Sequence, residues 1–320
     1  EKGFKDKLCG DVRTLGVPAS WNEQANDLYT FMGRGWYEKD VFVPDEWRGK
    51  AVYLRFGSVA GVATVFVNGK EAFAHTGTAL PFEKDISEYL CFGETNRITV
   101  IADNTLDPLS LPPASDKAGE GHAGFTDSYP AVPYDFFPYG GIQRSVWLYS
   151  AAKNRIEDIC VKTDVSGNGA KVCYEIKFTS RFSGEVTVET NGQKQILSAN
   201  DTDNICGEFK IENPRLWDIG KPELYELTVE TDFDEYSLSY GIRTIKVSGN
   251  EFLLNGKPVF FKGFGKHEDF FVLGKGFNAA LWAKDFHLLK WIGANSFRTS
   301  HYPYDENIYD YADKNGILII

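Results

Sequence analysis

Arg298 and His301 are residues near the end of this chain that could bind or orient a ligand. They stand at the end of a predicted strand and just before Tyr302 and Pro303, which favour a turn. A guanidinium offers a planar charged fork to a carboxylate, and an imidazole can donate or accept a hydrogen bond near neutral pH. From position alone, structural roles are an equal alternative, with Arg298 in a buried ion pair and His301 bonded to backbone.

A strand–helix–strand unit must position these two side chains. The sequence predicts a strand at 296–298, an amphipathic helix at 305–315 that stops at Gly316, and an apolar strand at 317–320. Strands joined by a crossover helix run parallel, and barrel enzymes keep their active sites at the carboxyl ends of such strands. The sequence therefore predicts Arg298 and His301 at an edge that can carry a site.

A similar unit precedes this one. It has an apolar strand at 258–262 and a helix at 278–292, whose predicted apolar face consists of Leu281, Phe286, Leu288, Leu289 and Ile292. The order βαβαβ predicts that residues 248–320 are the first units of a TIM barrel. Three strands cannot close a barrel, so we expect the barrel to continue beyond Ile320.

The rest of the chain favours a multidomain, mainly β protein. Residues 1–152 contain short runs of alternating hydrophobicity from residue 40 onward, with a hairpin turn at Asn68 and Gly69, and predict a jelly-roll sugar-binding-like sandwich. Residues 153–247 contain about seven short alternating runs, which predict an immunoglobulin-like sandwich with a structural role.

The connection at 103–138 is rich in Pro, Gly, Asp and aromatic residues and has little periodicity. A loop of this length is usually functional or disordered. Its end, 134–142, is too apolar for disorder, so we expect it to be ordered against another surface and to form a pocket wall. Asp135 lies in this end, where a turn cap is the alternative to a binding role. His267 could line the same pocket, or be satisfied by the adjacent carboxylates.

Composition excludes several partners. A net charge of -11 and a pI near 5.1 argue against nucleic acid or an anionic membrane as the main partner. The chain contains no apolar run of membrane-spanning length, and its first residues are too polar for a secretory signal. We expect a cytoplasmic protein.

The cysteines indicate neither a disulfide framework nor a metal centre. They are odd in number and widely spaced, without a CxxC pair or a Cys/His cluster. This pattern predicts mostly buried thiols in a reducing compartment. The five positions are Cys9, Cys91, Cys160, Cys173 and Cys206.

Other chemistries fit the sequence less well. Residues 274–279 imitate a dinucleotide-binding loop, but no acidic residue follows at the end of the strand at 296–298 to bind a ribose. Glu268 and Asp269 are neighbours on an extended segment and point to opposite faces, so they cannot act as a pair on one bond. We expect them to bind the loop or the rim of the barrel. A non-catalytic carbohydrate-binding module, built from the two sandwiches and the loop, is the alternative from another functional class.

Several segments together resemble glycoside hydrolase family 2, which contains β-galactosidases and β-glucuronidases. They occur in the family's order and include 65–69, 141–146, 241–243, 264–269 and 295–303. Residues 264–269 are more similar to those of β-glucuronidases, and a β-galactosidase is the alternative within the family. The family's opening Gly-x-Trp-x-Phe strand is missing before Pro18.

The resemblance implies a retaining glycosidase that releases terminal β-D-glucuronic acid from small-molecule or oligosaccharide glucuronides, without a metal or other cofactor. Retention requires two carboxyl groups about 5 to 5.5 Å apart. In the family these are glutamates on the fourth and seventh barrel strands, so we expect them downstream of this chain. The 320 residues alone are therefore predicted to be inactive.

The resemblance also implies roles for residues within this chain. Arg298 would hold the nucleophilic glutamate ionised and oriented, and His301 would contact sugar hydroxyls. Asp135 would reach from the jelly-roll loop to a vicinal diol, since a carboxylate accepts two hydrogen bonds. His267 would line the same pocket. The complete protein is expected to be a homo-oligomer.

Overall fold

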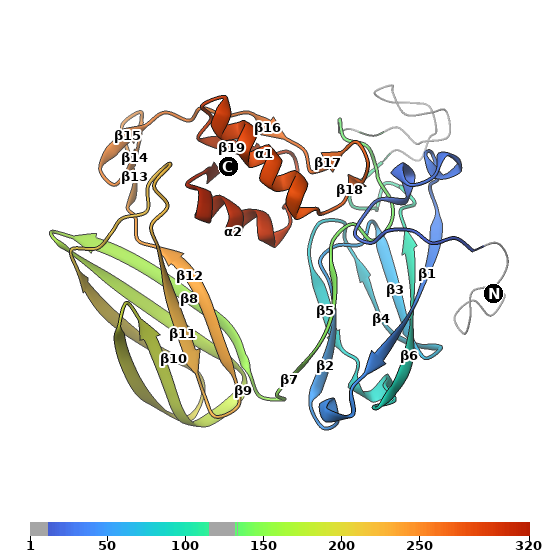
Figure 1. The fold of residues 1–320 in the computed structure, drawn as a ribbon, viewed down its shortest axis with the longest axis horizontal. Helices are drawn as coiled ribbons and strands as arrows, with labels where there is room; N and C mark the ends of the chain where they lie inside the picture. Colours follow the sequence, from blue (N-terminus) through green and yellow to red (C-terminus); the bar gives the residue numbers. More distant parts are fainter. Residues whose placement is uncertain (1–11, 115–131, 133) are drawn as a thin grey trace. The chain divides into compact units, whose positions relative to one another are not determined.

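The computed structural model describes residues 12–114, 132 and 134–320 (Figure 1). The chain divides into two compact units. The first comprises Glu1–Ser150, Lys266–Ala283 and Ser300–Asp305, and the second comprises Ala151–Gly265, Lys284–Thr299 and Glu306–Ile320. Each unit thus combines one β-sandwich with parts of the C-terminal segment.

The first unit contains a sandwich of two antiparallel sheets, which confirms the predicted jelly roll. One sheet has the order β1 (Arg34–Val43), β6 (Glu94–Asp103), β3 (Val62–Val67) and β4 (Lys70–Thr76). The other has the order β5 (Phe82–Asp85), β2 (Ala51–Phe56) and β7 (Val146–Ala151). Alternate residues of these strands, including Leu54, Phe56, Val65 and Val100, form its core. The described part of this unit also contains four short 3-10 helices: η1 (Trp21–Glu23), η2 (Asn26–Leu28), η3 (Asp45–Trp47) and η4 (Ser87–Tyr89).

The hairpin between β3 and β4 turns at Asn68 and Gly69, as predicted. Both residues have positive φ, 50° and 78°, which suits the tight turn that matches strand twist. The Asn68 side chain also donates to Asn96 Oδ1 at 2.8 Å and accepts from Arg97 N at 2.9 Å. The turn is therefore tied to β6 as well as to its own strands.

The second unit contains the immunoglobulin-like sandwich. Its strands are β8 (Ile156–Ser166), β9 (Gly169–Thr190), β10 (Gln193–Glu212), β11 (Leu224–Glu230) and β12 (Glu235–Gly241). The order is β10-β9-β11-β12, and β8 also pairs with β9. The predicted count of about seven short strands is wrong, because β9 and β10 are long strands of 22 and 20 residues. A register shift at Thr202 interrupts this long pair.

An antiparallel meander follows, made of β13 (Ile245–Ser248), β14 (Glu251–Leu254) and β15 (Lys257–Val259). The predicted barrel strand at 258–262 is therefore wrong: only its start is a strand, and that part pairs antiparallel with β14. The physical reason is the turn at Asn255 and Gly256, whose φ values of 53° and 74° form a second tight hairpin. Strand β16 (Gly265–Lys266) comes next.

The last two helices and strands agree with the sequence prediction. They are α1 (Ala279–Trp291), β19 (Ser296–Thr299), α2 (Glu306–Asn315) and β20 (Leu318–Ile319). Strands β19 and β20 pair in parallel, as one βαβ step requires. These helices, of 13 and 10 residues, are the two α-helices in the described part of the chain, and both are shorter than the roughly 20 residues that span a bilayer.

The buried face of α1 differs from the predicted one. Trp282, Phe286 and Leu289 are buried, whereas Leu288 is 44% exposed and Ile292, just past the helix, is 56% exposed. The buried positions follow the spacing i, i+4, i+7 of one helix stripe. Within the second unit, the Phe286 ring packs edge-on against Phe297 of β19 and Tyr311 of α2.

A small hairpin precedes α1. Strand β17 (Asp269–Phe270) pairs antiparallel with β18 (Gly274–Lys275). Gly274 has a positive φ of 56° and ends the turn. The glycine-rich run at 274–279 therefore belongs to a hairpin rather than to the strand-to-helix turn that binds a dinucleotide pyrophosphate.

Candidate functional site

Asp135 and His301 lie side by side in the first unit. His301 Nε2 is 3.3 Å from Asp135 Oδ1. Asp135 belongs to the end of the connection between β6 and β7, and His301 belongs to the turn between β19 and α2. Their side chains are 74% and 40% exposed, so a ligand can reach both. The pair combines a strong acceptor with a group that can donate, which suits a hydroxyl-rich ligand.

His267 completes a cluster with these two residues. One potential ligand atom from each of Asp135, His267 and His301 lies within 4.8 Å of the other two. The two imidazole rings meet edge to face, with centroids 5.7 Å apart. His267 Nδ1 is buried and has no hydrogen-bond partner among the described residues, so the adjacent carboxylates do not satisfy this nitrogen.

Aromatic rings hold the loop that carries Asp135. Tyr134 and Phe136, its two neighbours in sequence, stack with centroids 4.2 Å apart. Phe136 packs edge-on against Tyr302 at 5.4 Å and lies 6.3 Å from the His267 ring. The prediction that 134–142 is ordered against another surface is confirmed. Most of the preceding stretch, 115–131 and 133, lies outside the described residues.

A buried ion pair between Arg144 and Glu268 supports the segments that carry the two histidines of the cluster. Glu268 accepts a hydrogen bond from Arg144 Nη2 and another from Asp305 N, each at 2.9 Å. Arg144 also donates to the backbone oxygens of Ala79 and Pro303. These bonds join the sandwich, the segment after His267 and the turn that carries His301. Glu268 thus binds Arg144, which follows the loop, and the turn before α2, and a contact with the loop itself stays a prediction. The sequence analysis did not identify Arg144. The only indication of its role was that it is the single charged residue in the segment 141–146.

Lys275 is a second buried charge behind the turn. Its Nζ lies 3.4 Å from the centroid of the Tyr302 ring, a close cation–π contact. Burial lowers the pKa of Lys275, Glu268 opposes this shift and Arg144 adds to it, and together these effects bring the pKa from 10.5 to about 8. Burial, together with the charge of Asp269, raises the pKa of Tyr302, whose hydroxyl accepts from Glu268 N at 3.3 Å. The residue after His301 is therefore fixed on both its ring face and its hydroxyl.

Arg298 belongs to the second compact unit. Its backbone N donates to Phe264 O at 2.9 Å, which anchors β19 locally, and the residue is exposed. Its role toward a nucleophilic carboxylate stays a prediction.

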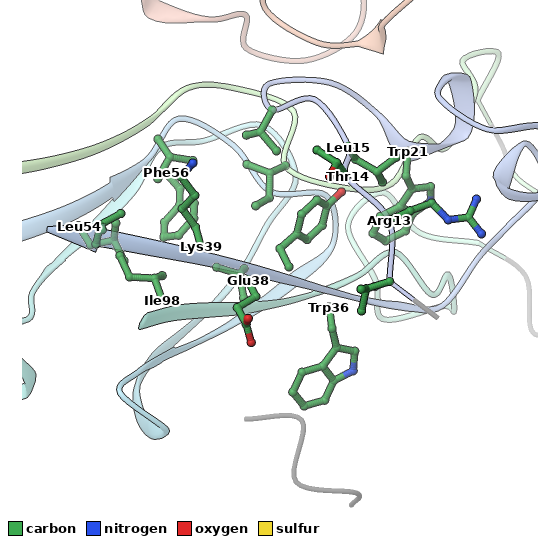
Figure 2. Close-up of a pocket in the computed structure, with 18 of the residues that line it drawn as sticks. Arg13, Thr14, Leu15, Trp21, Trp36, Glu38, Lys39, Leu54, Phe56 and Ile98 are labelled. Atoms are coloured by element: carbon green, nitrogen blue, oxygen red, sulfur yellow. The ribbon is translucent and has the colours of Figure 1, made fainter. Parts of the chain in front are cut away.

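Another opening lies within the first unit's sandwich. It is an open cleft of about 980 Å³ between the two sheets (Figure 2). Core side chains such as Leu54, Phe56 and Ile98 line it, and Glu38 and Lys39 stand on β1. None of the predicted site residues lines this cleft. Its walls combine apolar core residues with the charged side chains of Arg13, Glu38 and Lys39.

The described cysteines correct one sequence prediction. Cys91 and Cys206 are exposed, and Cys160 and Cys173 are half-buried, so the expectation of mostly buried thiols is wrong for these four. On β9 the larger Val172 and Tyr174 point into the core, and strand alternation turns Cys173 to the other face. Cys9 lies outside the described residues.

Comparison with known families gives matches along nearly the whole chain. The sugar binding domain of glycosyl hydrolases family 2 matches residues 6–152. A second model of glycosyl hydrolases family 2 matches 144–243, and the family's TIM barrel domain matches 245–320.

Individual relatives of the chain are β-glucuronidases. The chain is 42% identical to a β-glucuronidase of Paenibacillus borealis, over 100% of this chain and 55% of the relative. It is 38% identical to the β-glucuronidase of Homo sapiens, over 97% of this chain and 51% of the relative. The chain thus spans about half the length of these curated relatives. A solved structure of a β-glucuronidase from Ruminococcus gnavus in complex with D-glucuronic acid has a TM-score of 0.88 and 36% identity, covering 100% of this chain and 55% of that one.

Proposed function

Because the chain belongs to glycosyl hydrolase family 2, we propose that it supplies the substrate-positioning part of a β-glucuronidase. The complete enzyme would release terminal β-D-glucuronic acid from small-molecule or oligosaccharide glucuronides. The matched relatives are β-glucuronidases, and one of the similar structures contains D-glucuronic acid, which supports a glucuronide over a galactoside.

The observation that carries this proposal is the Asp135–His267–His301 cluster. The Asp135 carboxylate can accept hydrogen bonds from two neighbouring hydroxyls, and His301, 3.3 Å away, can donate to or accept from a third group. A sugar presents such hydroxyls around its ring. The rings of Phe136 and Tyr302 pack together and give the cluster an apolar flank against which the less polar face of a sugar can rest.

The covalent chemistry requires groups other than this cluster. A retaining glycosidase needs one carboxylate as nucleophile and one carboxyl group as acid and then base, about 5 to 5.5 Å apart. We propose that glutamates of later barrel strands are the nucleophile and the acid. Arg298 is proposed to orient the nucleophile through its planar fork and to favour its ionised form.

Hydrolysis distinguishes this proposal from a binding module. A polypeptide that joins these residues to a complete barrel should hydrolyse para-nitrophenyl β-D-glucuronide and leave the matching β-D-galactoside nearly untouched. Binding of D-glucuronic acid without hydrolysis would favour the module. Faster hydrolysis of the galactoside would favour a β-galactosidase.

Two further properties are part of the proposal. The four described cysteines are free thiols, which supports a reducing, cytoplasmic setting. We propose that the complete protein is a homo-oligomer there. Cell fractionation and analytical ultracentrifugation of the complete protein test the two statements separately.

A further inference from the structure

Lys275 is a buried cation behind the Asp135–His267–His301 cluster, and the proposed chemistry does not use it. The residue is 6% exposed, and its Nζ lies 3.4 Å from the centroid of the Tyr302 ring. We propose that Lys275 is a positioning residue: its charge holds the Tyr302 ring, and this ring holds the segments that carry the sugar-binding side chains. The inference rests on the proposed glucuronidase function.

The Tyr302 ring links the two segments of the site. Tyr302 directly follows His301 in the chain, and its ring packs edge to face with Phe136, at 5.4 Å between centroids. Phe136 in turn directly follows Asp135. The His267 ring lies 6.3 Å from the Tyr302 ring, so the same ring also borders the third member of the cluster. A displacement of the Tyr302 ring therefore moves groups on both sides of the bound sugar.

The backbone of Lys275 gives the side chain a fixed base. Lys275 N donates to Ser20 Oγ at 3.1 Å, and Ser20 Oγ donates to Lys275 O at 3.3 Å. The side chains of Glu23 and Tyr139 lie against the preceding Gly274, and the Tyr139 hydroxyl is 3.4 Å from Glu23 Oε1. All these residues belong to the first compact unit. The ammonium group is thus held at the ring face, where exclusion of water strengthens a cation–π contact.

The charges around Lys275 allow pH to switch this contact. Burial disfavours the ammonium form, the carboxylates of Glu268 and Asp269 favour it, and Arg144 disfavours it, which together bring the pKa to about 8. Burial raises the pKa of the facing Tyr302 hydroxyl above its ordinary value of 10.0. Lys275 therefore loses its proton at a lower pH than Tyr302 does, and the contact weakens while the ring stays neutral.

The kinetic test uses a polypeptide in which these residues continue into a complete barrel. We measure kcat/KM for para-nitrophenyl β-D-glucuronide from pH 6.5 to pH 9.5, for the unaltered protein and for Lys275→Met. At pH 6.5 the variant should have a value about tenfold lower, because small displacements of positioning groups are costly. At pH 9.5 the two values should converge, since the unaltered protein has lost the same charge. The matched control Lys84→Met changes an exposed lysine of β5 and should equal the unaltered protein throughout.

A second measurement needs neither activity nor a variant that folds. The 320-residue chain is prepared with 4-fluorophenylalanine in place of Phe136, and its fluorine resonance is followed by NMR against pH. This label does not titrate, so a step with a midpoint near pH 8 reports the loss of the Lys275 charge through the Tyr302 ring. The step should be absent in Lys275→Met and present in Lys84→Met.

The proposal is overturned if the unaltered chain shows no step, or if the step persists in Lys275→Met. A ratio of kcat/KM values that stays constant with pH also overturns it, because packing by the side-chain stem does not depend on charge. If the complete polypeptide fails to hydrolyse the glucuronide while the lysine-dependent step is present, the positioning role is upheld and the glucuronidase proposal fails.

Discussion

Arg144 and Glu268 form an ion pair 2.9 Å long whose side chains are only 4% and 6% exposed. The pair connects the sandwich of the first unit to the turn that carries His301, because Arg144 also donates to Pro303 O and Glu268 also accepts from Asp305 N. Neither residue belongs to the candidate site. Their bonds hold the segment that follows His267 and the turn that follows His301.

Arg144→Met should destabilise the chain strongly. It leaves the Glu268 carboxylate buried without its charged partner, and breaking a buried ion pair in this way costs about 3 to 5 kcal/mol. Urea denaturation measures the loss. The double variant Arg144→Met/Glu268→Leu should recover part of it, because the unpaired charge is gone. The matched control Arg181→Met breaks the exposed pair with Asp201 and should hardly move the denaturation midpoint. Equal losses at Arg144 and Arg181 would contradict the assigned role.

Lys275 should make stability rise at alkaline pH. Burial depresses its folded-state pKa from 10.5 to about 8, so the unfolded chain binds more protons than the folded chain between these pH values. Stability contributed by this group therefore increases with pH across that window, by about 3 kcal/mol at about 1.4 kcal/mol per pKa unit. The free energy of unfolding is measured for the unaltered chain and for Lys275→Met from pH 8 to pH 10.5. Both proteins contain the same tyrosines, so the difference between the two curves reports the titration of Lys275. Parallel curves for the two proteins would show that Lys275 does not titrate as described.

The buried face of α1 predicts unequal effects for neighbouring apolar residues. Phe286→Ala should cost about 3 to 5 kcal/mol, because it removes a buried ring packed on Phe297 and Tyr311. Leu288→Ala, at a position 44% exposed, should cost much less. Thermal unfolding of the two variants checks the order. A larger loss at Leu288 would favour the helix face predicted from sequence.

Kinetics of the complete enzyme test the sugar-binding roles. Asp135→Asn and His301→Gln should each lower kcat/KM for the glucuronide roughly ten- to hundredfold, the equivalent of about 1.5 to 3 kcal/mol for a sugar hydroxyl left without its partner. The controls Asp201→Asn and His287→Gln make the same changes at exposed positions outside the cluster and should leave kcat/KM unchanged. Unchanged kinetics in both site variants would reject the assignment.

Local chemistry made much of the fold predictable. The turn at Asn68 and Gly69 follows from residue types that accept positive φ, and α1 and α2 follow from helical periodicity ended by glycine. The strand predicted at 258–262 failed because an apolar run does not reveal whether its neighbour is parallel or antiparallel. The Asn255–Gly256 signal beside it would have indicated a hairpin.

The candidate site was predictable in part. Asp135, His267 and His301 were identified, and the resemblance implied a shared pocket, but no local pattern specifies the path of the long connection that brings Asp135 to the two histidines. The Arg144–Glu268 pair joins residues distant in sequence, so only coordinates could reveal it. The outward thiol of Cys173 was within reach of sequence reasoning, since Val172 and Tyr174 on either side are the larger core candidates.

The most direct test of the account compares hydrolysis of para-nitrophenyl β-D-glucuronide by the 320-residue chain and by a polypeptide in which the same residues continue into a complete barrel. The account predicts hydrolysis by the complete polypeptide only, because Asp135 and His301 position a sugar while the nucleophile and the acid are glutamates of later strands. Hydrolysis by the 320-residue chain that disappears when one of its own acidic residues is changed, for example Asp269→Asn, would contradict it and show that the catalytic pair lies within this sequence.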